Sequence, residues 1–267
     1  MRPGIDLHCH ILPGVDDGPA TLGESLRLGR LAAADGTGHV VATPHVSDVD
    51  PDTIPERVRE LQASFDLDSV PVGLSPGGEV DLASAFDLGE ATLAAIAQGP
   101  RRRRWILLEA PLRASPPSAV AEAVATLRSR GFGSVIAHPE RSPMLMSDGA
   151  VALRQLVAAG ARVQVSASSL VGAHGDATTK AALALLRWGI PHVIASDAHS
   201  AERPPRLREA ARAVARAGMS AALIRRLFHD GPWKLAQAGV SSTGAWTPAA
   251  VAGPDAEGSP RASANCA

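Results

Sequence analysis

The residues with the clearest capacity for chemistry are histidines and carboxylates near both ends of the chain. Asp6-Leu7-His8-Cys9-His10 stands near the start, Asp16-Asp17-Gly18 follows it, and Ser196-Asp197-Ala198-His199 comes much later. In a β-strand, residues two apart point to the same side, so His8 and His10 can converge on one ion. Two close histidines also occur by chance, so the pair needs support from the rest of the chain.

Further candidate ligands stand just after short apolar runs. They are Thr43-Pro44-His45, Glu79, Glu109 and His138-Pro139-Glu140-Arg141. Imidazoles and carboxylates without thiolates suit Mn²⁺, Fe²⁺ or Zn²⁺, whereas an all-oxygen set would indicate Mg²⁺ or Ca²⁺. A single catalytic zinc needs about three protein ligands, and the candidates here suffice for two or three ions. Clustered ions activate water and neutralise charge during displacement at phosphorus. The pattern therefore favours a metallohydrolase of phosphoesters.

Apolar runs alternate with stretches long enough for helices. The expected strands are Ile5–Leu7, Val40–Ala42, Val70–Leu74, Ile106–Leu108, Val135–Ala137, Val163–Val165 and Val193–Ala195. The expected helices span roughly 22–35, 53–65, 89–99, 117–130, 148–159 and 177–188, and Thr21 with Glu24 can form a capping box for the first. Alternation predicts an α/β fold with a mostly parallel sheet. Because candidate ligands follow nearly every strand, a closed or distorted barrel is favoured over an open sheet.

Composition limits the class of protein. The 267 residues are 45% hydrophobic but only 3% aromatic, with no Tyr, so the core must be aliphatic. A net charge of −1 argues against general attraction to nucleic acid or anionic membranes. Cys9 lies within a candidate metal motif and Cys266 lies at the other end of the sequence, so the two cysteines do not indicate a disulfide framework. With no signal peptide and no apolar run of membrane-spanning length, we expect a cytoplasmic protein without membrane insertion.

Taken in order, the motifs resemble a known superfamily. Residues 5–18, Ala42-Thr43-Pro44-His45, Gly78-Glu79, Ala137-His138-Pro139-Glu140-Arg141 and Ala195-Ser196-Asp197-Ala198-His199 are similar to those of the PHP (polymerase and histidinol phosphatase) superfamily. Within it they look most like the CpsB/CapC-type bacterial tyrosine-protein phosphatases of capsule and exopolysaccharide loci. The likeness runs from about residue 5 to residue 230. The chain beyond is rich in Ala, Gly, Ser, Pro and Thr.

The resemblance implies a distorted (βα)₇ barrel in one domain, residues 1–240. The composition of residues 241–267 predicts a low-complexity, disordered tail. The resemblance also implies a centre of three ions, usually Mn²⁺, with Fe or Zn as alternatives. The implied metal ligands are His8, His10, Asp17, His45, Glu79, Glu109, His138, Asp197 and His199. His8, His10, Glu79 and Asp197 would hold one ion, Glu79 would bridge to a second held by Glu109 and His138, and Asp17, His45 and His199 would hold the third.

Other roles also follow from the resemblance. Asp17 is preferred to Asp16 because the family's ligand directly precedes the glycine. Arg141 and Arg203 would bind the phosphoryl oxygens. The implied activity is removal of phosphate from phosphotyrosine in a protein, with a tyrosine autokinase that controls polysaccharide export as the partner. Because the chain has no Tyr, it cannot itself be the substrate.

Three departures from the family pattern concern substrate choice. Asp81, Ala110 and Val46 stand where the family often has a basic, an aromatic and a histidine residue, respectively. A site with less cationic and aromatic surface has fewer groups suited to bind phosphotyrosine. Two alternatives therefore stay open: a PHP phosphatase of a small metabolite such as histidinol phosphate, and a non-catalytic binding module.

Other chemistries find little support. A cysteine-based tyrosine phosphatase needs an arginine six residues after its thiolate, but Val15 follows Cys9 at that spacing. A serine hydrolase would need Gly-x-Ser-x-Gly, which the sequence lacks. The basic run Arg101–Arg104 is interpreted as a solvated turn, with an anionic partner surface as the alternative. His39, His174, His192 and His229 lie outside the motifs, and ordinary surface or packing roles are expected for them.

Overall fold

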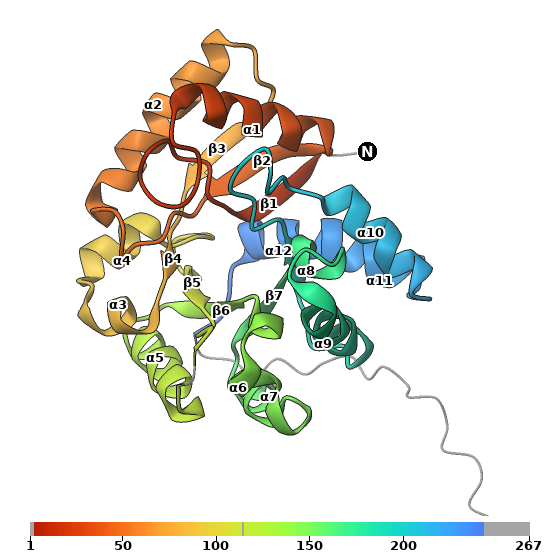
Figure 1. Cartoon of the computed structure of the whole chain (residues 1–267). Coiled ribbons are helices and arrows are strands. Elements are labelled where there is room, and N and C mark those ends of the chain that lie inside the picture. Colours follow the sequence, from red (N-terminus) through yellow and green to blue (C-terminus); the bar gives the residue numbers. More distant parts are fainter. Residues whose placement is uncertain (1–2, 114, 243–267) are drawn as a thin grey trace, which may run out of the picture.

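Parallel strands in two sheets form the centre of the molecule (Figure 1). A computed structural model describes residues 3–113 and 115–242. The first sheet joins β1 (Gly4–Cys9), β2 (Thr37–Ala42) and β3 (Gly73–Pro76). The second joins β4 (Glu79–Val80), β5 (Trp105–Glu109), β6 (Gly133–Ala137), β7 (Arg162–Ser166) and β8 (Val193–Ala195). In both sheets the order of the strands follows the chain, which confirms the predicted α/β class.

The two sheets meet at the segments that carry the candidate ligands. A parallel bridge pairs His45 with Glu79, and another pairs Cys9 with Ala198. At the second seam the amide of His10 donates to the carbonyl of Ala198 at 2.8 Å, and the amide of Asp197 donates to the carbonyl of His8 at 2.9 Å. These bonds close the sheets into a distorted barrel, as the sequence predicted.

The described residues contain eight strands where seven were predicted. The added strand, β4, has only two residues, too few for an apolar run to reveal it. The strand predicted over Val70–Leu74 begins instead at Gly73. Pro71 lacks a donor for the sheet ladder, and the amide of Val70 donates to the carbonyl of Phe65, which ties this segment to the preceding helix.

Most predicted helices are present. They are α1 (Leu22–Ala34), α2 (Ile54–Leu67), α5 (Pro117–Ser129), α7 (Val151–Ala158) and α9 (Gly175–Arg187). Thr21 caps α1 by accepting from the amide of Glu24, as predicted. The helix predicted over 89–99 is shorter, α4 (Glu90–Ile96), and α3 (Leu82–Asp87) precedes it. Asp81 caps α3 by accepting from the amides of Ala83 and Ser84, so its carboxylate is engaged in the fold.

The remaining elements are short turns and a C-terminal helical segment that the sequence analysis did not predict. The turns are η1 (Pro51–Thr53), η2 (Pro139–Arg141), α6 (Pro143–Met146), η3 (Ser147–Gly149) and α8 (Ala167–Leu170). The segment comprises α10 (Leu207–Arg216), α11 (Ala221–Arg225), η4 (Arg226–Asp230) and α12 (Gly231–Ala238). Beyond Ser242, the predicted tail lies outside the described residues. Among the described residues, no helix has the length and apolar character needed to span a membrane.

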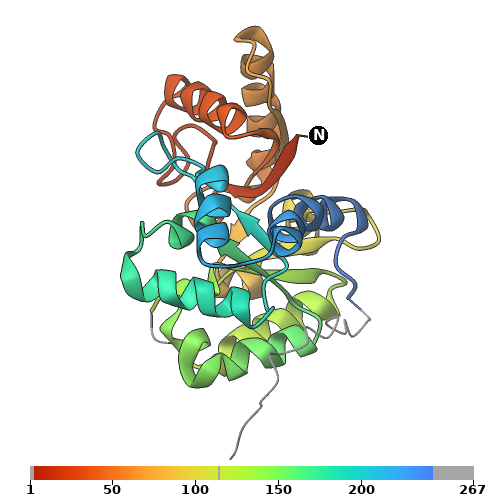
Figure 2. The same ribbon diagram turned by 90° about the vertical axis from the view of Figure 1, so that its right-hand side faces the viewer.

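Side chains alternate between two cores. Along β5, Trp105 and Leu107 face the barrel interior with Leu7 and Val135, while Ile106 and Leu108 pack outward against the helices. Those helices lie around the two sheets, with α1 and α2 beside the first and α5, α7 and α9 around the second (Figures 1 and 2). The interior is closed at the amino ends of the strands by Leu235 of α12, whose carbonyl accepts from the Trp105 indole at 3.3 Å. The opposite end of the barrel is left for polar groups.

Candidate metal centre

The structure brings all the predicted ligands together at the carboxyl ends of the strands. Sets of ligand atoms within 4.8 Å of one another are formed by His10, Asp17, His45 and His199; by His8, His10 and Glu79; by His8, His138 and Asp197; and by His45, Glu79 and Glu109. Every predicted ligand belongs to at least one set. Strands β1, β4 and β5 carry some of them directly, and the segments after β2, β6 and β8 carry most of the others.

Glu79 occupies the middle of this arrangement. Its Oε2 atom lies 3.3 Å from His8 Nε2, 3.2 Å from His10 Nε2 and 3.3 Å from His45 Nδ1. Its Oε1 atom lies 2.8 Å from His138 Nε2. The side chain is 1% exposed. A buried carboxylate with histidines on both oxygens has the position expected of a ligand shared between ions.

Three histidines have their ring orientation set by acceptors behind them. The Nδ1 atoms of His8, His10 and His199 lie 3.1 Å from Gln164 Oε1, 2.6 Å from Asp16 Oδ2 and 2.9 Å from the carbonyl of Asp197, respectively. Each acceptor receives a hydrogen bond from an Nδ1–H group. The proton of the neutral ring therefore stays on Nδ1, and the Nε2 lone pair is available to the site.

The spacing of these nitrogens fits the predicted ions. His8 Nε2 and His10 Nε2 are 3.2 Å apart, which is the separation of two ligands bound to one ion at about 2.1 Å each. His138 Nδ1 is buried without a hydrogen-bond partner among the described residues. The donor set and its spacing therefore suit divalent ions of the imidazole-binding type.

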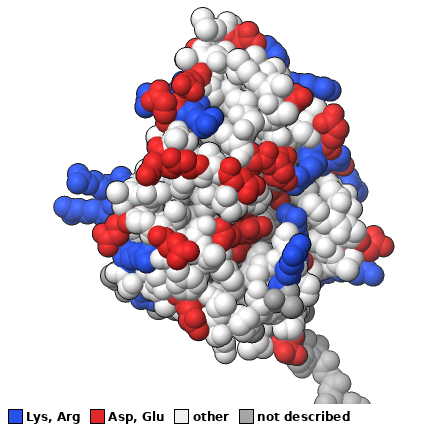
Figure 3. Space-filling view, turned by 60° about the vertical axis from the view of Figure 1, so that its left-hand side comes forward, with Lys and Arg blue, Asp and Glu red and all other residues white. Residues whose placement is uncertain are grey.

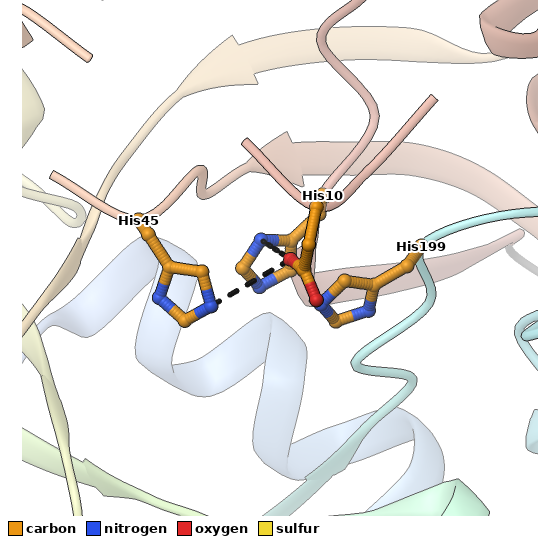
Figure 4. Close-up of side chains that lie close together, drawn as sticks. His10, His45 and His199 are labelled. Atoms are coloured by element: carbon orange, nitrogen blue, oxygen red, sulfur yellow. Dashed lines mark ion pairs between the residues drawn. The ribbon is translucent and has the colours of Figure 1, made fainter. Parts of the chain in front are cut away.

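The two neighbouring aspartates have different positions. Asp16 accepts from the His10 ring, from the amide of His45 at 3.1 Å and from the amide of Gly18 at 2.9 Å. Asp17 Oδ1 instead lies 3.1 Å from His199 Nε2 and 3.7 Å from His45 Nε2. Figure 4 shows the His10, His45 and His199 rings converging. The geometry favours Asp17 as the ligand and gives Asp16 the task of orienting His10.

Replacing Asp16 with asparagine should weaken metal binding without removing a ligand. The amide keeps the shape of the side chain but loses the charge that fixes the His10 tautomer, and changes of this kind cost roughly 10- to 100-fold in metal affinity. Metal titration of the metal-free protein would measure the change. Asp48→Asn, at an exposed position, is the matched control. Equal affinity of D16N and the unaltered chain would show that Asp16 has no such role.

Charge holds the metal-free centre together. Burial would lower the pKa of His8 and His10, but Glu79 with Asp197 raises that of His8 to about 9, and Asp16 with Glu79 raises that of His10 to about 10. Burial likewise opposes ionisation of Asp197, yet the nearby histidines hold its pKa at about 2. Figure 3 shows acidic side chains gathered across the middle of one face of the molecule. Divalent ions would replace the protons on these histidines.

Both predicted phosphate-binding arginines lie beside the centre. Arg141 follows His138, whose φ of 32° turns the chain sharply after β6, and its Nη1 atom donates to Asp197 Oδ2 at 3.0 Å. Arg203 donates to Asp17 Oδ2 at 2.8 Å, and its Nη2 atom lies 3.2 Å from His199 Nε2. Their side chains are 20% and 44% exposed, so both can reach a bound anion.

Several residues of the centre were not found by sequence reasoning. Gln164, which orients His8, is one of them. Ser166 ends the same strand, where the sequence allowed it to line the mouth of the barrel, and it donates to Asp197 Oδ2 at 3.2 Å. The alternating pattern of β7, with polar residues at 162, 164 and 166, was the available signal for a polar inner face. His174, for which an ordinary role was expected, instead lines a cavity of about 280 Å³ together with Asp197 and Arg203.

Cys9 takes no part in the centre. Its side chain is fully buried, and its Sγ atom lies 3.5 Å from the carbonyl of Ala198. Burial raises the pKa of the thiol well above its usual value, so the reactive thiolate is suppressed. The structure thus agrees with the exclusion of cysteine-based catalysis.

The sequence is similar to those of known proteins. The family described as "Capsular polysaccharide synthesis, CpsB/CapC" matches residues 4–237. Tyrosine-protein phosphatase YwqE of Bacillus subtilis is 31% identical over 202 residues, which cover 73% of this chain and 77% of YwqE. Putative tyrosine-protein phosphatase CapC of Staphylococcus aureus is 30% identical over 75% of this chain and 79% of CapC.

Solved structures agree with the sequence comparison. A structure from work on YwqE of B. subtilis and CpsB of Streptococcus pneumoniae, described there as unique metal-dependent tyrosine phosphatases, superimposes with a TM-score of 0.71. It is 28% identical and covers 83% of this chain and 90% of its own. The phosphotriesterase homology protein of Escherichia coli, at 12% identity and a TM-score of 0.51, shares the fold alone. The chain therefore belongs to the CpsB/CapC family of capsular polysaccharide synthesis proteins.

Proposed function

We propose that this protein is a metal-dependent phosphatase that removes phosphate from phosphotyrosine in a protein substrate. The observation that carries the proposal is the set of overlapping ligand groups around Glu79. The relatives named tyrosine-protein phosphatases support the choice of substrate. A binding module without catalysis would have no need for buried histidines and carboxylates held in this array.

The proposed cofactor is three Mn²⁺ ions. His8, His10, Glu79 and Asp197 would hold one, Glu79 with Glu109 and His138 the second, and Asp17, His45 and His199 the third. When bound, such ions supply a nucleophile from water at neutral pH and neutralise charge at the phosphoryl group. The mixture of imidazole and carboxylate donors suits Mn²⁺, Fe²⁺ or Zn²⁺ better than Mg²⁺ or Ca²⁺, which prefer all-oxygen ligands, and the choice of manganese among them rests on the family resemblance.

The protein's own side chains would bind and orient the phosphoryl group. Arg141 and Arg203 lie on two sides of the centre, paired with Asp197 and Asp17, respectively. Guanidinium groups present fixed, forked donors that match phosphate oxygens. Burial and the charge of Glu79 raise the pKa of Glu109, and a nearby cation would favour the charged form of this carboxylate.

The proposed partner is a tyrosine autokinase that regulates capsule or exopolysaccharide synthesis or export, encountered in the cytoplasm. The absence of Tyr from this chain requires that any phosphotyrosine come from another protein. The formal net charge of −1 gives no general attraction to polyanions, so recognition would depend on the centre and its rim.

Substrate choice can be tested with the full chain loaded with Mn²⁺. We expect phosphate release from phosphotyrosine peptides to exceed that from phosphoserine peptides and histidinol phosphate in kcat/KM. Preference for histidinol phosphate would overturn the protein-phosphatase proposal in favour of a small metabolite. Metal binding without turnover of any phosphoester would favour the binding module.

Removing the ions should abolish turnover reversibly. Dialysis against a chelator is expected to reduce phosphate release to background, and adding Mn²⁺ should restore it more fully than adding Zn²⁺ or Mg²⁺. Metal analysis would accompany the activity measurements. Circular dichroism of the chelated protein would verify that the chain had not unfolded. Full activity after complete metal removal would contradict the proposal.

A further inference from the structure

A second charged cavity lies at the opposite end of the barrel from the metal centre. It has a volume of about 470 Å³. Its lining includes four cationic residues, Arg103, Arg162, Arg226 and Lys234. Arg162 begins β7 and Ser166 ends it, so one strand carries the basic cavity at its amino end and the metal centre at its carboxyl end. The cavity is therefore separate from the proposed active site.

Cationic residues outnumber carboxylates in the described lining of this cavity. Among the described lining residues, Asp230 is the one carboxylate, and it pairs with Arg225 and His229, which do not line the cavity. No carboxylate of the described residues lies within ion-pair distance of Arg103, Arg226 or Lys234. The positive charge of Arg103, Arg226 and Lys234 thus has no carboxylate beside it in the described part of the chain, and it would attract an anion.

Burial and the cationic residues around this cavity lower the pKa of His192. Its Nδ1 atom accepts from the amide of Val163 at 3.1 Å, which requires the unprotonated form of that nitrogen. Burial, followed by Arg162, Arg226 and Lys234, lowers the pKa of the ring to about 3. The ring is thus neutral and offers no charge of its own. The guanidinium and ammonium groups remain as the cations that a ligand would meet.

The basic run that the sequence analysis left without a function contributes to this cavity. Arg104 donates to the carbonyl of Ala94 at 2.8 Å and is a structural residue. Arg103 lines the cavity. Its carbonyl accepts from the amide of Val240 at 3.0 Å, which ties the segment after α12 to the residues just before β5. Leu235, Ala238 and Gly239 complete an apolar wall.

We propose that this basic cavity binds a small organic compound carrying two or more phosphate charges, of about the size of a nucleoside diphosphate. The volume lies within the range of about 300–1,000 Å³ usual for small-molecule sites. Arginine and lysine together match phosphate oxygens, and the apolar wall can contact the organic part. A ligand here would connect η4 and α12 to the amino end of β7, so binding would also stabilise the closed barrel.

The test is calorimetric titration of the full chain with pyrophosphate and with adenosine diphosphate, in the absence of divalent ions. We expect saturable binding that weakens about tenfold or more in R226E/K234E, because each substitution replaces a cation that attracts the ligand with a carboxylate that repels it. R212E/R216E, with the same change of charge at exposed positions on α10, should bind as the unaltered chain does.

Activity separates this site from the metal centre. Phosphoester hydrolysis by Mn²⁺-loaded R226E/K234E should stay within about twofold of the unaltered chain, because neither residue belongs to the centre. Should that variant fail to fold by circular dichroism, R226Q/K234Q replaces it. Absence of saturable binding by the unaltered chain would overturn the proposal, and so would equal binding by R226E/K234E (or R226Q/K234Q) and the unaltered chain. If pyrophosphate alone bound, the organic part of the proposed ligand would be wrong.

Discussion

Replacing Glu79 with alanine is expected to abolish phosphatase turnover and to deplete the centre of metal. The two oxygens of Glu79 contact four histidine rings, those of His8, His10, His45 and His138. Loss of this carboxylate would leave the rings facing one another in a buried site without a shared counter-charge. Loss of a residue that only orients a metal ligand lowers activity roughly 10- to 100-fold. The fall in kcat/KM on loss of Glu79 should be larger than that.

Metal analysis and phosphate release would be measured on the same preparation. Glu122→Ala, at an exposed position on α5, is the control for loss of a carboxylate elsewhere. Glu79→Gln preserves the volume of the side chain and separates loss of charge from loss of packing. If E79A retained a full complement of ions and normal turnover, the shared-ligand arrangement would be wrong.

Replacing Arg141 with lysine is expected to lower kcat while leaving the ions in place. Arg141 contacts the centre through Asp197 Oδ2 but is itself no candidate ligand, since it carries no lone pair for a metal. A lysine retains the charge and loses the fork that matches two phosphate oxygens. Loss of one preorganised donor to developing charge costs about 10²- to 10³-fold in kcat.

A chemical rescue distinguishes this role from a structural one. Added guanidinium ion should restore part of the activity of Arg141→Ala and should leave the activity of Arg216→Ala, an exposed control on α10, unchanged. Unaltered metal content in both variants would show that the centre is intact. A normal kcat for R141K would remove Arg141 from the proposed phosphate site.

The sequence predicted the location of the candidate site better than the details of its surroundings. His8, Glu79 and Asp197 stand in short motifs, and the placement of such motifs after parallel strands is enough to predict that they converge. Gln164 has no motif, because its contact with His8 joins residues 156 positions apart and leaves no local pattern. Asp16 and Asp17 are neighbours, and only the direction of each side chain decides which of them faces the centre. The sequence alone does not give that direction, and the choice of Asp17 came from the family resemblance.

The fold shows the same limit. Short apolar runs predicted β5–β8, and the longer stretches between the runs predicted the major helices, since burial against a core selects such patterns. The strand β4 is two residues long, and it pairs with β5 only once the chain has closed. Helices α10 and α12 follow the last predicted strand, where the sequence analysis predicted no helix. Their place is determined by contacts with elements far away in the chain, those of α10 with α8 and those of α12 with β1 and β8.

Because candidate ligands lie at both seams between the two sheets, bound ions would stabilise the fold as well as support catalysis. His45 pairs with Glu79 at one seam, and Cys9 pairs with Ala198 at the other, next to the bonded backbones of His8 and Asp197. Ligands on both sides of each seam mean that the free energy of ion binding is coupled to closure of the barrel. Bound ions should therefore raise the free energy of unfolding of a chain that folds without them, so cellular supply of the metal would affect how long each molecule persists as well as how fast it works.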